Sequence, residues 1–152
     1  MTYDHLLIEA EKEGLIIKEK PLISSDGRIF GKKIAIRKDI PTLCQKACVL
    51  AEEIGHHYTA SGNILEQQST KNIKQERKGR IWAYDTMIGL SGIVMAYERH
   101  CSNHYEMADY LGVSEQFLHD ALHYYSQKYG NGAVYGQYII KFIPSLMVAK
   151  IY

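Results

Sequence analysis

The sequence predicts a mainly helical α+β domain with a small antiparallel sheet near its N-terminus. Two observations lead to this fold class. Residues 15–40 are rich in β-branched side chains and contain turn signals, whereas apolar residues recur at helical spacing over most of the chain beyond residue 43. The chain has 152 residues, of which 46% are hydrophobic and 23% are charged, so we expect one domain covering residues 1–152.

The N-terminal part is predicted to hold one helix followed by the strands of the sheet. Apolar residues at helical spacing indicate a helix over residues 2–13, and Gly14 is a typical residue to end it. Residues 15–23 favour a strand, and the turn signal at residues 24–27 separates it from one or two strands in residues 28–40. Ile34 and Ile36 alternate with more polar neighbours, which indicates that one face of the sheet is buried.

The remaining chain is predicted to be helical. Pro41 and Thr42 are suited to the start of a helix, which we expect over residues 43–58. Residues 61–63 should stop it, and a polar loop should follow to about residue 71. Further helices are expected at residues 72–87, 92–100, 105–111 and 114–128, and residues 138–152 are interpreted as an apolar tail that packs on the domain or faces a partner.

Charge and cysteine content exclude several classes of protein. The net charge is only +1, so we expect no direct nucleic-acid binding. No stretch reaches the roughly 20 apolar residues that a membrane span needs. Three cysteines, an odd number, and the absence of an apolar leader predict a reducing, cytoplasmic location.

The candidate catalytic and metal-binding residues lie at the end of the first long helix. Residues 44–54 are apolar almost all round, which is typical of a buried helix, yet Glu52 and Glu53 lie within this stretch and His56 follows. Buried carboxylates are costly unless a cation compensates them, and a metal ion would do so. Glu52 and His56 are one turn apart, the spacing of helical zinc ligands, and Glu53 is then placed as a general base. The alternative is that a carboxylate lies at the exposed edge of the helix, paired with Lys or Arg.

A third ligand is expected from the helix at residues 72–87. Glu76 shares a face with Gly79 and Ala83, two small residues that would let this helix pack closely against the one carrying His56. Asp85 is the rival ligand, but it lies about half a turn around the helix. We therefore prefer Glu76 as the third ligand.

At these positions the chain resembles the ImmA/IrrE family of metallopeptidases. Residues 34–42 (IAIRKDIPT) and 48–59 (CVLAEEIGHHYT) are similar to the family's segment around HELGH, and residues 76–85 (ERKGRIWAYD) are similar to its second motif helix. The resemblance implies a zincin-like fold, with zinc held by Glu52, His56 and Glu76 and with Glu53 as the catalytic base. Glu52 departs from the family, because it stands where the family has its first zinc histidine.

The resemblance also implies a function. It predicts a zinc-dependent endopeptidase whose substrate is a protein, typically a helix-turn-helix repressor of a prophage or other mobile element. Because Glu52 replaces a histidine, a second hypothesis is a catalytically degenerate module that binds such a repressor without cleaving it. A third is DNA binding through residues 108–125, which resemble a helix-turn-helix, but the acidic start of the second helix would repel phosphate and favours a core hairpin.

Two further groups of residues could bind a metal. His100 and His104, and likewise His119 and His123, are four residues apart, but we interpret both pairs as surface histidines because no glutamate accompanies them as in HExxH. Cys44 and Cys48 have the same spacing and are interpreted as buried small hydrophobic residues.

Overall fold

The computed structural model describes residues 1–60 and 69–151, with side chains in the second stretch described from residue 73 onward. It divides into two compact units, Met1–Thr86 and Met87–Tyr152. Helices form most of the described chain and each unit carries a three-stranded sheet, so the predicted mainly helical α+β class is confirmed. The candidate residues Glu52, His56 and Glu76 all belong to the first unit.

The first unit contains three helices and three strands among its described residues. They are α1 (Tyr3–Lys12), β1 (Ile16–Lys20), β2 (Gly27–Phe30), β3 (Lys33–Arg37), α2 (Leu43–Thr59) and α3 (Ser69–Met87). Helix α2 begins where predicted, because the Thr42 hydroxyl accepts a hydrogen bond from the Gln45 backbone N–H at 3.1 Å. Helix α3 begins three residues before the predicted residue 72, and the expected stop and loop at residues 61–68 lie outside the described residues.

The N-terminal sheet is mixed rather than purely antiparallel. Strands β2 and β3 form the expected antiparallel hairpin, with a left-handed Gly31 in its turn, but β1 pairs in parallel with β3 on the other side. Strand β3 lies in the centre, between β1 and β2, and its Ile34 and Ile36 side chains are almost completely buried. Strand β2 is therefore an edge strand, which matters for the site described below.

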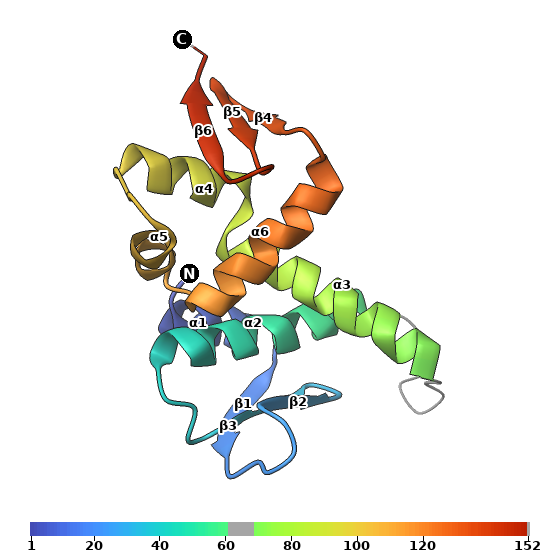
Figure 1. Ribbon diagram of the computed structural model, residues 1–152. Coiled ribbons are helices and arrows are strands. Elements are labelled where there is room, and N and C mark those ends of the chain that lie inside the picture. The colour runs from blue at the N-terminus through green and yellow to red at the C-terminus, as the bar shows by residue number, and fades with distance from the viewer. Residues whose placement is uncertain (61–68, 152) are drawn as a thin grey trace. The chain divides into compact units, whose positions relative to one another are not determined.

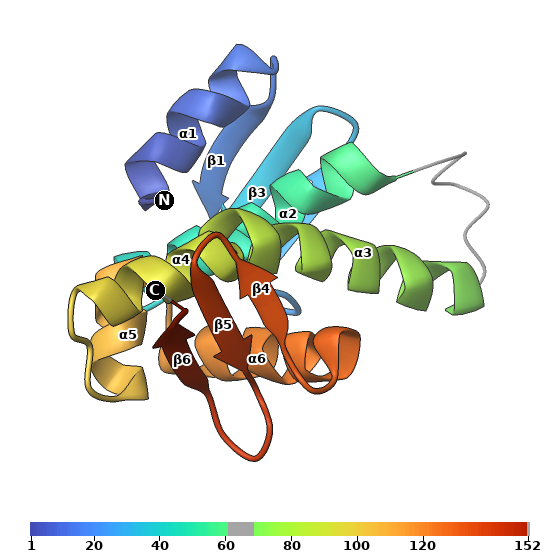
Figure 2. The ribbon, with the colours of Figure 1, turned by 90° about the horizontal axis from the view of Figure 1, so that it is seen from above.

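Helix α2 connects the sheet to the other helices of this unit. It packs against β2, β3 and α1, and its Leu50, Ala51 and Ile54 are buried together with the inner face of β3. Figure 1 shows that α2 and α3 run side by side in opposite directions, and Figure 2 shows the same pair seen from above. The predicted apolar helix is thus the centre of the first unit.

The second unit contains the remaining elements. They are α4 (Gly89–Glu98), α5 (His104–Leu111), α6 (Glu115–Tyr129), β4 (Ala133–Tyr135), β5 (Tyr138–Lys141) and β6 (Met147–Lys150). The predicted hairpin of α5 and α6 is present, with Gly112 in the left-handed conformation and Ser114 capping α6. The expected apolar tail is instead part of an antiparallel β4-β5-β6 sheet, in which Ile140 is fully buried. None of the helices in the described ranges is long and apolar enough to cross a membrane.

Candidate functional site

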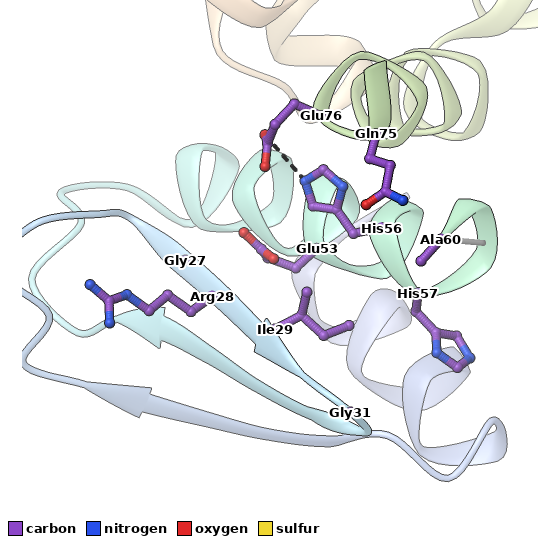
Figure 3. Close-up of a pocket in the computed structure, with 10 residues that line it drawn as sticks. All are labelled: Gly27, Arg28, Ile29, Gly31, Glu53, His56, His57, Ala60, Gln75 and Glu76. Carbon is purple, nitrogen blue, oxygen red and sulfur yellow. Dashed lines mark ion pairs between the residues drawn. The ribbon is translucent and has the colours of Figure 1, made fainter. Parts of the chain in front are cut away.

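A pocket in the first unit brings together most of the residues that the sequence singled out. Its volume is about 370 Å³ and it opens between α2, α3 and the β2–β3 hairpin (Figure 3). Its lining residues are Gly27, Arg28, Ile29, Gly31, Glu53, His56, His57, Ala60, Gln75 and Glu76.

His56 and Glu76 meet at the wall of this pocket. The His56 Nε2 atom lies 3.4 Å from Oε2 of Glu76, although the two residues come from different helices. The His56 side chain is only 12% exposed, whereas Glu76 is 59% exposed, so the carboxylate reaches in from the rim toward a largely buried ring (Figure 3). An imidazole nitrogen and a carboxylate oxygen at this separation are two groups that a divalent metal ion accepts as ligands.

Two glycines allow the helices to bring these side chains together. A Cβ atom on Gly55 would lie 2.4 Å from the Gly79 carbonyl oxygen, so α2 and α3 are in backbone contact at this point. A Cβ atom on Gly79 would lie 2.4 Å from Nδ1 of His56, which means that the imidazole ring rests directly on the glycine backbone. The close packing expected at Gly79 is therefore present, and it also sets the position of the His56 ring.

Glu53 faces the same pocket from α2, on the side of the sheet. Figure 3 shows its carboxylate between α2 and strand β2, below the His56–Glu76 pair. A Cβ atom on Gly27 would lie 3.0 Å from Oε1 of Glu53 and 2.8 Å from a methyl group of Val49, so only glycine leaves room for this carboxylate. The sequence indicated Gly27 only as a turn residue, because nothing in its neighbourhood shows that another segment approaches it.

The surroundings of Glu53 change its ionisation. Burial, followed by repulsion from the carboxylates of Glu76 and Glu52, raises the pKa of Glu53 from 4.5 to about 7. Desolvation disfavours the charged carboxylate, and two nearby negative charges act in the same direction. A carboxyl group with a pKa near 7 can both accept and release a proton close to neutral pH, which is the property required of a general acid–base group.

The other predicted ligands do not line the pocket. Glu52 is half-buried on α2, next to the pocket wall, and it contributes to the electrostatics of Glu53. Asp85 is exposed on α3, so Glu76 is the acidic residue of this helix that contacts His56. Among the described side chains, no three His, Cys, Asp or Glu residues gather closely enough to hold a metal ion. The structure thus brings two of the predicted ligands together with the predicted base.

An aromatic contact joins the two helices beside the pocket. The rings of Tyr58 on α2 and Trp82 on α3 are stacked with their centroids 5.2 Å apart, and His57 contacts Tyr58 edge-on. The sequence alone did not indicate that these aromatic residues belong to the site. Stacked aromatic pairs contribute about 1 kcal/mol beyond their burial, so this contact supports the helix spacing that His56 and Glu76 require.

The rival residues lie elsewhere. His100, His104, His119 and His123 belong to the second unit and form no metal-binding group with other described residues. Cys48 is buried, as the interpretation of a small hydrophobic residue expects, whereas Cys44 is half-buried, and neither forms a disulfide bond with another described residue.

Comparisons with known proteins do not place the chain in a family. No family model, no curated protein and no solved structure matches it. The interpretation of the pocket therefore depends on its own geometry and chemistry.

Proposed function

We propose that the protein is a metal-dependent endopeptidase whose active site is the pocket between α2, α3 and strand β2. The observation that supports this most strongly is the contact between His56 and Glu76, which are 3.4 Å apart at the wall of a pocket that Glu53 also lines. Two ligand-type side chains from separate helices would supply two of the three protein ligands of a catalytic zinc site, and the carboxyl group of raised pKa beside them is a candidate general base.

The residues present fit a metal ion in part. His56 and Glu76 would supply one nitrogen and one oxygen ligand, and we propose zinc because it accepts both. Glu52, one helical turn before His56, is the third ligand in this proposal. A bound zinc ion would polarise the scissile carbonyl group and make a nearby water molecule more acidic.

Glu53 is the catalytic residue in this proposal. Its carboxylate would take a proton from the attacking water and deliver that proton to the leaving amine nitrogen. The backbone of Gly27 lies against this carboxylate and holds it at the floor of the pocket. Gly79, on which the His56 ring rests, would hold this ring with its Nε2 atom toward Glu76.

The pocket is also suited to an extended peptide. Strand β2 is an edge strand of its sheet, and its residues Gly27, Arg28 and Ile29 line the pocket. A peptide that paired with this edge would pass Glu53 with its backbone hydrogen-bonded. The resemblance noted in the sequence supports a helix-turn-helix repressor of a mobile element as the substrate protein.

Metal content tests the site. The protein is purified without added metal, and its zinc content is measured for the wild type, His56→Ala, Glu76→Gln and Asp85→Asn. We expect one zinc ion per chain in the wild type and in Asp85→Asn, and loss of zinc in the other two variants. Loss of zinc in Asp85→Asn with retention in Glu76→Gln would show that the ligand assignment is wrong.

Cleavage of a repressor tests the chemistry. Glu53→Gln should keep its zinc but cleave at least about 100-fold more slowly, since general acid–base catalysis contributes that much or more. The second hypothesis, a non-catalytic binding module, is favoured because Glu52, the proposed third ligand, is not among the residues that line the pocket. A wild-type protein that binds the repressor but neither holds zinc nor cleaves would support that module and overturn the peptidase.

A further inference from the structure

The outer face of the N-terminal sheet carries a cluster of positive charges, of which only Arg28 also lines the pocket. Pairing of β1 with β3 places Ile16 beside Lys33 and Lys18 beside Ala35, and pairing of β2 with β3 places Phe30 beside Lys33 and Arg28 beside Ala35. Because side chains alternate along a strand, these residues share the face opposite to the buried Ile34 and Ile36. We call this surface the basic face; its members are Ile16, Lys18, Lys20, Arg28, Phe30, Lys33 and Ala35.

The cations of the basic face are available to a partner. Lys18, Lys20 and Lys33 are exposed and form no ion pair with any other described residue. Arg28 uses its guanidinium group to donate to the hydroxyl oxygens of Ser24 and Ser25, at 2.6 and 3.1 Å, and these neutral contacts leave its charge uncompensated.

The neighbouring acidic residues do not neutralise this face. Glu19 alternates with Lys18 and Lys20, so it lies on the opposite face of β1, where it pairs with Lys46. Asp26 and Asp39 both pair with Arg37, at 3.1 and 3.5 Å, and Arg37 lies next to Lys20 at the end of this face.

An aromatic and an aliphatic side chain lie among these charges. Phe30 is 74% exposed and Ile16 is 50% exposed, and the two lie on either side of Lys33. The hollow on this face is lined by these residues and by Lys18, Lys20 and Arg28, with no acidic side chain in its lining. A flat aromatic ring beside several unpaired cations on an open sheet is the arrangement on which unpaired nucleic-acid bases stack while the cations contact phosphates.

We propose that the basic face binds single-stranded nucleic acid. One base would stack on Phe30, and the phosphates on either side would contact Lys33 and Arg28, then Lys18 and Lys20 along β1. Lys18 and Lys20 are two residues apart on one strand, so they are about 7 Å apart and lie in a row. The bases of a duplex cannot stack on Phe30 in this way, because they are already stacked on one another. The four unpaired cations favour a polyanion, and the exposed ring favours one with bases over an acidic peptide.

The binding of a labelled oligothymidylate tests this proposal. Fluorescence anisotropy of an oligomer of about 12 nucleotides is measured with the full-length protein between about 50 and 200 mM salt. If the four cations each neutralise a phosphate, the logarithm of the binding constant should fall with the logarithm of salt concentration with a slope of about −3.

Two sets of variants distinguish the contribution of the positive charges to binding from that of the Phe30 ring. Lys18→Gln combined with Lys33→Gln should weaken binding at least about tenfold at low salt and should reduce the slope to about −1.5, because two phosphate contacts are lost. Phe30→Ala should weaken binding about tenfold and leave the slope unchanged, since stacking involves no counterion release. Lys141→Gln combined with Lys150→Gln removes the same charge from the C-terminal sheet and should leave the affinity unchanged.

Several outcomes would overturn the proposal. Equal weakening in the Lys141→Gln, Lys150→Gln control would show that binding reflects overall charge. Equal affinity for a duplex of the same length, together with no effect of Phe30→Ala, would exclude base stacking. Displacement of the oligonucleotide by polyglutamate at the same charge concentration would assign the face to an acidic protein segment. Zinc content and repressor cleavage do not enter these measurements, so the proposed peptidase function and this inference stand or fail independently.

Discussion

Replacement of Glu53 by Gln should change how the stability of the metal-free protein depends on pH. In the folded protein the pKa of Glu53 is raised from 4.5 to about 7, whereas in the unfolded chain it returns to its ordinary value. Between these two pH values the unfolded state releases the proton while the folded state keeps it. The free energy of unfolding of the wild type therefore decreases as pH rises from about 4.5 to about 7 and levels off above that range.

The magnitude follows from the size of the shift. Each pKa unit corresponds to 1.36 kcal/mol, so the ionised Glu53 side chain costs the folded state roughly 3 kcal/mol at pH 8. Glutamine carries no charge and nearly the same shape, so it removes this pH-dependent cost. We expect the free energy of unfolding of Glu53→Gln to increase by about 3 kcal/mol relative to that of the wild type as the pH rises from 4.5 to 8.

Urea unfolding in the presence of a chelator measures this effect. Trp82 is the single tryptophan of the chain and is stacked on Tyr58, so its fluorescence reports on the separation of α2 and α3. Glu11→Gln is a suitable control because Glu11 is exposed on α1 and away from the pocket. Parallel stability curves for the wild type and Glu53→Gln from pH 4.5 to pH 8 would refute the buried, electrostatically strained environment assigned to Glu53.

Three further changes test the packing around the site. Gly79→Ala places a methyl group 2.4 Å from Nδ1 of His56. The overpacking cost of about 1–3 kcal/mol should exceed the gain of up to about 1 kcal/mol in helix propensity, so the protein should become less stable. Because the His56 ring must move, zinc affinity should fall at least about tenfold. Thr42→Ala removes the cap of α2 and should lower the free energy of unfolding by about 1 kcal/mol in urea titrations. Leu50→Ala empties a fully buried position and should cost about 2–5 kcal/mol in the same assay; a loss below 1 kcal/mol would contradict its place in the core.

Local patterns in the sequence were sufficient for most of the helical elements. The Thr42 cap, the apolar run before Ile54 and the left-handed glycine at Gly112 act within a few residues, so their consequences can be inferred without the fold. The C-terminal sheet was missed because its strands are only three or four residues long and lack clear alternation. Short strands obtain their stability from their neighbours rather than from their own sequence.

The topology of the N-terminal sheet also required the structure. Alternation at Ile34 and Ile36 predicts which face is buried, but it does not say which strand lies on each side of β3. After β1 the chain crosses to the far edge of the sheet and forms β2 there. It then returns as β3 between the two, so that β1 and β3 run parallel. The basic face follows from this order, and a net charge of +1 could not reveal it because acidic residues elsewhere cancel the sum.

The sequence by itself determined the helix that carries Glu53 and His56, the residue types available to the site, and Glu76 as the preferred partner from the next helix. Only the tertiary structure decided that His56 rests on Gly79, that Gly27 makes room for Glu53, and that Glu52 lies outside the pocket lining. The physical reason is the distance along the chain between the residues that interact. Helix formation depends on contacts between residues three or four positions apart, whereas the ionisation of Glu53 and the approach of Glu76 depend on which distant backbone packs against α2.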